Sequence, residues 1–185
     1  YKRQKFTLSR KDPHYVGLAK EVQKAEKARE ADSCPLEAFP ELENAWKAMK
    51  EITPDADSRN TGIGSTIFAV KPGDGSAREQ AASCQKVLGG WANIANEYAT
   101  KRYRSNLINW GMLPFIIKEG ELPFQNLDYL FIPGIRKAVE EKAPVIKAYV
   151  VGKGEKKEFD LTLGELTDEE RQIILKGCLI NYNRV

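Results

Sequence analysis

The sequence predicts an α/β fold, in which short buried strands alternate with helices. Residues 65–70 form a β-branched and aromatic run that leads through a glycine-rich loop into a helix. A second apolar run covers residues 91–96 and a third covers residues 113–118, with helical sequence between them. Strands that alternate with helices in this way are typical of α/β proteins, which bind ligands at the carboxyl ends of their strands.

Length and composition indicate one globular domain of ordinary size. The 185 residues are 42% hydrophobic and 30% charged, with a formal net charge of +3 and a pI of about 8.7. A chain of this length buries a sizeable core. The mild positive charge does not by itself indicate nucleic acid, and no apolar run approaches the roughly 20 residues of a membrane span. We therefore expect neither a nucleic-acid partner nor a membrane.

Cysteine and histidine usage argues against a metal site within the chain. Cys34, Cys84 and Cys178 are widely spaced and include no C-x-x-C pair, so a disulfide framework is not expected. His14 is the only histidine, and we expect neither a Ser-His-Asp triad nor a His-based metal site. We expect a reducing, cytoplasmic location. The chain begins at Tyr1 without methionine, and we expect it to be part of a longer protein.

Residues 1–61 predict a helical extension packed on the domain. Asp12 and Pro13 are typical of an N-cap and a first helical residue, and apolar residues then recur at helical spacing. A second helix is expected over residues 40–53. The polar residues 55–64 predict a connecting loop.

Strands and helices also alternate after the second strand. The expected elements are a helix over 98–109, strands over 113–118 and 129–132, a short helix over 135–141, a hairpin of strands 145–151 and 157–163, and a capped helix over 167–176.

The loop after the first strand carries the residues most indicative of function. It reads Gly-Asp-Gly-Ser-Ala-Arg-Glu-Gln from Gly73, and Ser76 and Glu79 have the S-x-x-E spacing of a capping box. We expect Ser76 to cap a helix that runs to about residue 87, with Glu79 bonding back to its amide. The free amides of the first helical turn favour an anion, and Arg78 can hold a carboxylate through two hydrogen bonds.

Four short motifs follow one another here in a fixed order. They are Gly73-Asp74-Gly75-Ser76-Ala77-Arg78-Glu79-Gln80, Leu88-Gly89-Gly90, Ser105-Asn106-Leu107 and Gly111-Met112-Leu113-Pro114. In order and spacing they resemble G-x-G-S-S-R-E-H, L-G-G, T-N-L and G-L-L-P of the swivel domain in the aconitase and isopropylmalate isomerase superfamily. With residues 163–181, the resemblance covers about residues 62–181. It implies an aconitase-type swivel domain, a mixed β-sheet flanked by helices, with residues 62–185 as its core.

The resemblance implies a hydro-lyase that dehydrates and hydrates a hydroxy di- or tricarboxylic acid. Ser76 matches the family's serine base, and Arg78 matches the arginine that binds a substrate carboxylate. Gly75 and Ala77 are expected beside them at the substrate. The other residues singled out are expected to shape the loop and the fold: Gly73, Glu79 and Asn106.

The resemblance also implies what the chain lacks. A [4Fe–4S] cluster is expected in the full enzyme, bound by other domains and by no residue of this chain. The cluster-bearing domains and a small carboxylate substrate are the expected partners, and the isolated domain is expected to be inactive.

Two residues depart from the family motif. Ala77 replaces the second serine and removes a hydroxyl from the substrate pocket, and Gln80 replaces the histidine and removes a titratable group. We therefore expect a divergent hydratase-like member that does not act on citrate.

Other interpretations of the same residues stay open. Ser76 is also explained as a helix cap alone, and Arg78 as the partner of a nearby carboxylate such as Glu79 or Asp74. The chain is also explained as a degenerate domain, or as a module that binds an anion or RNA. The RNA hypothesis depends on basic residues interleaved with aromatic ones: Tyr98, Lys101, Arg102, Tyr103 and Arg104.

Overall fold

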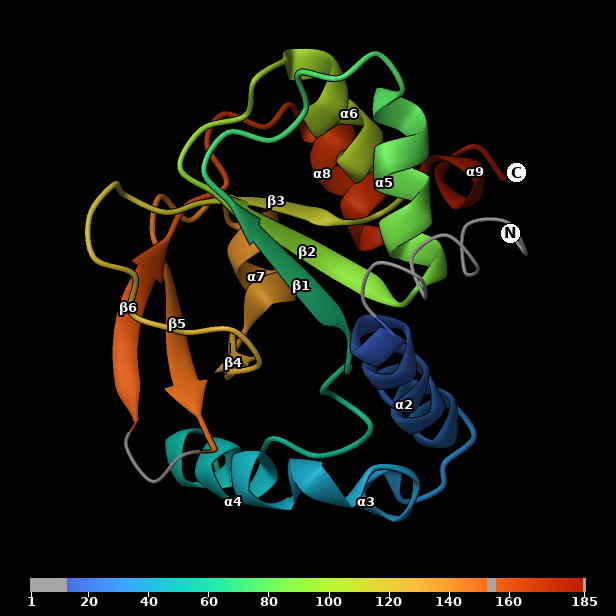
Figure 1. The fold of residues 1–185 in the computed structure, drawn as a ribbon, viewed down its shortest axis with the longest axis vertical. Coiled ribbons are helices and arrows are strands. Elements are labelled where there is room, and N and C mark those ends of the chain that lie inside the picture. The colour runs from blue at the N-terminus through green and yellow to red at the C-terminus, as the bar shows by residue number, and fades with distance from the viewer. Residues whose placement is uncertain (1–12, 153–155, 185) are drawn as a thin grey trace.

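A computed structural model describes residues 13–152 and 156–184. Two three-stranded sheets lie at the centre, and helices pack around them (Figure 1). The predicted α/β fold class, with helices packed on the strands, is confirmed. The predicted N-cap Asp12 and most of the predicted turn at 152–155 lie outside the described residues.

The first sheet is parallel and contains the strands that flank the glycine-rich loop. Its order is β1-β2-β3, so β2 is central and almost fully buried. Ile94 of β2 is 1% exposed and lies opposite Phe68 on one side and Phe115 on the other. The strands and the helices that connect them are β1 (Ser65–Ala69), α5 (Arg78–Val87), β2 (Gly90–Ala95), α6 (Lys101–Asn109) and β3 (Leu113–Ile116).

The second sheet is antiparallel, with the order β4-β5-β6. It joins the parallel sheet through one bridge, in which Ile116 and Thr162 exchange backbone hydrogen bonds of 2.7 and 2.9 Å. Apolar residues of both sheets share the main core, which explains why the mixed arrangement is one body. The elements are β4 (Tyr129–Phe131), α7 (Ile135–Glu140), β5 (Ile146–Val151), β6 (Lys157–Leu161), α8 (Asp168–Leu175) and α9 (Leu179–Tyr182).

Most predicted elements are confirmed within about two residues at each end. The expected helix over 98–109 begins later, at Lys101, because Thr100 is its N-cap and accepts a hydrogen bond from the Tyr103 amide at 3.2 Å. The expected helix over 40–53 begins as the 3₁₀ turn η1 (Pro40–Leu42) and continues as α4 (Glu43–Ile52). The single-turn helices α3 (Pro35–Ala38) and α9 were not predicted, since four residues show no periodicity.

The long helix α2 (Pro13–Glu30) lies at the end of the parallel sheet where the strands begin (Figure 1). Gln23 Nε2 donates to the carbonyl of Val87, just before β2, at 2.6 Å. The Glu26 carboxylate accepts from the Ile63 amide, just before β1, at 2.8 Å. One helix is therefore bonded to the start of two neighbouring strands. The division into an extension of residues 1–61 and a core of residues 62–185 stays a prediction.

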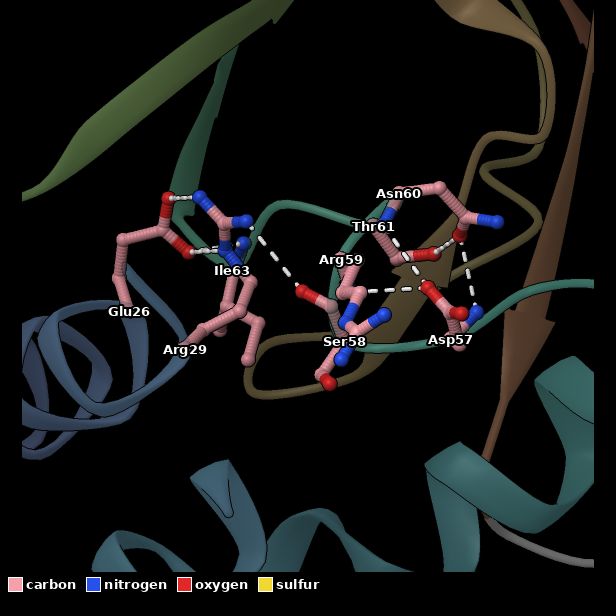
Figure 2. A network of polar contacts seen from close by, with 8 residues as sticks. All are labelled: Glu26, Arg29, Asp57, Ser58, Arg59, Asn60, Thr61 and Ile63. Carbon is pink, nitrogen blue, oxygen red and sulfur yellow. Dashed lines mark hydrogen bonds and ion pairs between the residues drawn. The ribbon is translucent and has the colours of Figure 1, made fainter. Parts of the chain in front are cut away.

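Glu26 holds this junction through a nearly buried ion pair (Figure 2). Its two oxygens accept from Arg29 Nε and Nη2 at 2.7 and 2.8 Å, and Arg29 Nη1 donates to the Ser58 carbonyl at 3.3 Å. The hydrogen bonds that Arg29 donates to Glu26 raise the pKa of Arg29 and outweigh the opposing effect of burial. The carboxylate thus fixes both the arginine and the chain that enters β1.

We expect Glu26→Gln to lower the free energy of unfolding by about 1–3 kcal/mol, because Arg29 loses its charged partner in a poorly solvated position. Urea unfolding followed by circular dichroism measures the change. Glu21→Gln is the matched control, since Glu21 pairs with the exposed Lys24 in the same helix, and should change stability by less than about 0.5 kcal/mol. Equal effects of the two substitutions would contradict the role of Glu26.

Candidate functional site

The glycine-rich loop lies at the carboxyl end of β1, as predicted. The chain that follows β2 runs beside it, where Glu97 N donates to Val70 O at 3.1 Å and Ala99 N donates to Pro72 O at 2.9 Å. The parallel pairing of β1 with β2 brings these two segments to one edge of the sheet. This is the edge at which α/β folds place ligands.

Gly73 is held in place more tightly than its neighbours in the loop, by the Tyr103 ring and by two hydrogen bonds. Its φ is +101°, and a Cβ there would lie 2.5 Å from the Cβ of Tyr103. Its carbonyl accepts two hydrogen bonds, from Arg78 Nε and from Thr100 Oγ1, each at 3.0 Å. Only glycine combines this backbone angle with so close an approach, which explains its place in the motif.

The predicted capping box at Ser76 is wrong. The helix begins at Arg78, one residue later than a cap at Ser76 requires, and its N-cap Ala77 has a non-helical φ of −88° and ψ of 51°. Glu79 is then the second helical residue instead of the third, and its carboxylate accepts from Trp110 Nε1 at 3.1 Å. Ser76 is exposed, and its hydroxyl has no hydrogen bond to any residue that the structure describes.

A true capping box does form at the start of α8. The Glu170 amide donates to Thr167 Oγ1 at 3.1 Å, and the Thr167 amide donates to Glu170 Oε2 at 2.9 Å. The same sequence spacing is therefore satisfied at α8 and not at α5. The difference lies in the loop before α5, because Arg78, the first residue of that helix, bonds back to carbonyls of the loop.

Arg78 is half-buried and holds the loop carbonyls. Besides the bond to Gly73, its Nη2 donates to the Asp74 carbonyl at 3.4 Å. The suggested ion pair with Asp74 or Glu79 does not form. Nη1 has no partner among the described residues, so one side of the guanidinium can still donate.

The first turn of α5 keeps its amides available. Ala77 has no polar side chain to cap them, and the first helical bond runs from Ala81 N to Ala77 O at 3.0 Å. Ser76 and Gly75 lie exposed just before this turn, and no atom would contact a Cβ at Gly75 within 4 Å. The exposed Ser76 hydroxyl, the free amides and Arg78 thus follow one another in the chain at the start of α5, and groups of these kinds suit a small anion.

Asn106 lies in α6, away from the loop in sequence. It is half-buried, and its carbonyl accepts from the Trp110 amide at 3.2 Å where the helix ends. Its predicted structural role stays a prediction.

Sequence reasoning missed a buried polar cluster behind the loop. The Tyr103 hydroxyl accepts from Asn93 Nδ2 at 2.8 Å and from Gln85 Nε2 at 3.0 Å. Asn93 is 2% exposed in the middle of β2. A polar residue inside the apolar run Trp-Ala-Asn-Ile-Ala was the available signal.

The aromatic surface needed for the RNA hypothesis does not form. Tyr103 is 2% exposed, and the Tyr98 hydroxyl lies 3.2 Å from the Asn93 carbonyl and 3.0 Å from the Phe115 carbonyl. Burial raises the pKa of Tyr98 above its ordinary value. Arg104 is engaged with the carbonyls of Leu163 and Glu165, which removes it from an exposed basic patch.

Neither a metal site nor a membrane helix is found within the part of the chain that the structure covers. No group of three or more His, Cys, Asp or Glu side chains there lies close enough to hold a metal ion. Cys34 is exposed, Cys84 and Cys178 are half-buried, and all three are free thiols. The residues present therefore do not fit an iron–sulfur cluster. No described helix is both long and apolar enough to cross a membrane.

The glycine-rich loop that starts at Gly73 and the α/β fold that carries it are both features of aconitase-type swivel domains. The chain belongs to the aconitase C-terminal domain family, whose model matches residues 16–120. The match begins within α2, earlier than the residue 62 expected from the motifs.

Two curated relatives are aconitate hydratases A. Over 146 residues the chain is 30% identical to that of Rickettsia bellii and 29% identical to that of Rickettsia felis, and each match covers 75% of this chain. Only 16% of either relative is covered, so the chain spans about one sixth of their length. A solved 3-isopropylmalate dehydratase from Methanocaldococcus jannaschii is 24% identical with a TM-score of 0.47, over 78% of this chain and 81% of that one.

We expect Gly73→Ala to destabilise the chain by more than about 1 kcal/mol, because the new methyl group meets Tyr103 at a backbone angle that alanine rarely adopts. The midpoint of urea unfolding measures this. Gly75→Ala is the matched control in the same loop, where space is open, and should stay within about 0.5 kcal/mol of the parent. A tolerated alanine at Gly73 would show that the loop does not depend on this contact.

Proposed function

We propose that this chain is the swivel domain of an aconitase-like hydro-lyase, which removes water from a hydroxy di- or tricarboxylic acid and adds it back. The observation that supports the proposal is an uncapped helix start at the carboxyl end of β1, where Arg78 is bonded to the Gly73 carbonyl and Ser76 is exposed. Membership of the family supports it.

Arg78 binds a substrate carboxylate in this proposal. Its Nε and Nη2 are committed to the loop carbonyls, which fixes the plane of the guanidinium and aims Nη1 and the remaining hydrogen of Nη2 at the ligand. A pre-oriented cation loses less conformational entropy on binding than a mobile one. Gly75 leaves room for the substrate to approach, and Ala77 contributes no hydroxyl to it.

Ser76 takes the proton from the carbon beside that carboxylate. A serine hydroxyl is a weak base near neutral pH, so its alkoxide needs stabilisation by hydrogen-bond donors placed as in an oxyanion hole. The amides of the first turn of α5 are suited to this, and losing one such donor typically costs about a hundred- to a thousandfold in rate. Because Ser76 is exposed here, other domains must exclude water from it.

The remainder of the site belongs to partner domains in this proposal. They carry the [4Fe–4S] cluster, which supplies Lewis-acid chemistry when bound, and this chain provides no ligand to it. The isolated domain is then inactive. Three free cysteines fit the proposed cytoplasmic location.

The test measures loss of unsaturated di- and tricarboxylates such as aconitate by the complete enzyme, after anaerobic cluster reconstitution. Ser76→Ala should lower kcat by about a hundred- to ten-thousandfold, because the base is lost. Arg78→Ala should raise KM by about ten- to a hundredfold, because a charge-assisted contact is lost. Ser83→Ala is the control on the same helix, since the Ser83 hydroxyl donates to the Gln80 carbonyl within that helix, and it should leave both constants unchanged.

Two results would contradict the proposal. Full turnover in Ser76→Ala would exclude the serine as the base. Carboxylate binding by the wild type without turnover on any substrate, and with loss of binding in Arg78→Ala, would instead establish an anion-binding or degenerate domain.

A further inference from the structure

The buried cluster of Gln85, Asn93 and Tyr103 lowers the stability of the fold, because two of its polar atoms are unpaired in the described part of the chain. Gln85 Oε1 and Asn93 Oδ1 are buried and have no hydrogen-bond partner within the described residues. Both amides donate to the same atom, the Tyr103 hydroxyl oxygen. Apolar side chains of similar size would fill the same space without unpaired acceptors. Polar groups kept at such a position point to a task other than stability.

Tyr103 connects this cluster to the loop by direct contact. Its side chain packs so closely against Gly73 that no side chain fits there, with a Cβ at that position 2.6 Å from Tyr103 Cγ and 2.7 Å from Cδ1. The two amides come from different elements, Gln85 from α5 and Asn93 from β2. The ring is therefore held at its far end by the helix and the sheet, and at its near end it supports the loop.

A second path runs through the backbone of the same residue. The Tyr103 amide donates to Thr100 Oγ1 at 3.2 Å, and Thr100 Oγ1 donates to the Gly73 carbonyl at 3.0 Å. Arg78 Nε donates to that same carbonyl at 3.0 Å. The Gly73 carbonyl oxygen, which orients Arg78, is therefore held in place by Tyr103, both by ring packing and through hydrogen bonds.

We infer that Tyr103 is a positioning residue for the anion site. Gln85 and Asn93 hold its hydroxyl, and the ring in turn fixes the position of the Gly73 carbonyl, to which the Arg78 guanidinium is bonded. The inference rests on the proposed carboxylate role of Arg78. Without the hydroxyl the ring loses both restraints at its far end, the Gly73 carbonyl loses its fixed support, and the guanidinium is less well aimed. The first effect is on substrate affinity and not on the chemical step.

Tyr103→Phe in the complete enzyme tests this, because it removes only the hydroxyl and keeps the ring against Gly73. KM for the carboxylate substrate should rise about three- to tenfold, as for loss of a modest interaction, while kcat changes by less than about twofold. In an Arg78→Ala background, Tyr103→Phe should have no further effect, since it acts through the arginine.

Tyr98→Phe is the matched control. Tyr98 is a neighbouring tyrosine on the same segment, and its hydroxyl also bonds inside the protein, to the carbonyls of Asn93 and Phe115. It should lower stability without changing KM. The comparison separates a general loss of stability from a loss of positioning.

Limited trypsin digestion of the complete enzyme gives a second readout that needs no turnover. Tyr103→Phe should speed cleavage after Arg78 about threefold or more, because the arginine and its loop are held less firmly. Cleavage after Lys142, in the exposed turn that follows α7, is the internal reference and should not change. Tyr98→Phe should change neither rate.

The possible outcomes separate the inference from the proposed function. An unchanged KM and unchanged cleavage in Tyr103→Phe would overturn the inference, as would effects equal to those of Tyr98→Phe or additive with Arg78→Ala. If Arg78→Ala itself leaves KM unchanged, the proposed role of the arginine fails. Faster cleavage after Arg78 would then still support Tyr103 as the residue that orders the loop, and unchanged cleavage would reject it.

Discussion

The contact between Gly73 and Tyr103 is the constraint on which the candidate site depends. It permits only glycine at the start of the loop, and it fixes the carbonyl that Arg78 and Thr100 share. Because Arg78 reaches back to that carbonyl, the loop wraps around its guanidinium and α5 begins at Arg78 instead of at the serine. An exposed hydroxyl, uncapped amides and a half-fixed cation follow from this one contact.

The contacts that anchor α2 and the candidate site lie at opposite ends of the parallel strands. Helix α2 is bonded through Gln23 and Glu26 to the starts of β2 and β1, while the loop lies where β1 ends (Figures 1 and 2). The edge with the site has open space at Gly75 and an exposed Ser76. The contacts that hold α2 to the sheet and the residues of the candidate site are therefore separated along the strands.

Local patterns in the sequence were sufficient for the strands and the longer helices, since periodicity and turn residues decide those locally, but they missed the single-turn helices α3 and α9. They were not sufficient for the loop, because the capping-box spacing at Ser76 is overridden by the bonds of Arg78 to Gly73 and Asp74. The role proposed for Tyr103 could not be predicted either, since it depends on Gln85 and Asn93, which meet Tyr103 only where α5, α6 and β2 come together. The roles of Ser76 and Arg78 depend on family membership and stay proposals.

The most direct test of the central claim is a crystal structure of the complete enzyme with a di- or tricarboxylate bound. A ligand carboxylate should lie within hydrogen-bond distance of Arg78 and of the first-turn amides of α5, with Ser76 Oγ facing the carbon beside it. Arg78 should keep its bond to the Gly73 carbonyl. A ligand bound elsewhere, or Ser76 turned away from it, would contradict the assignment of this loop as the active site.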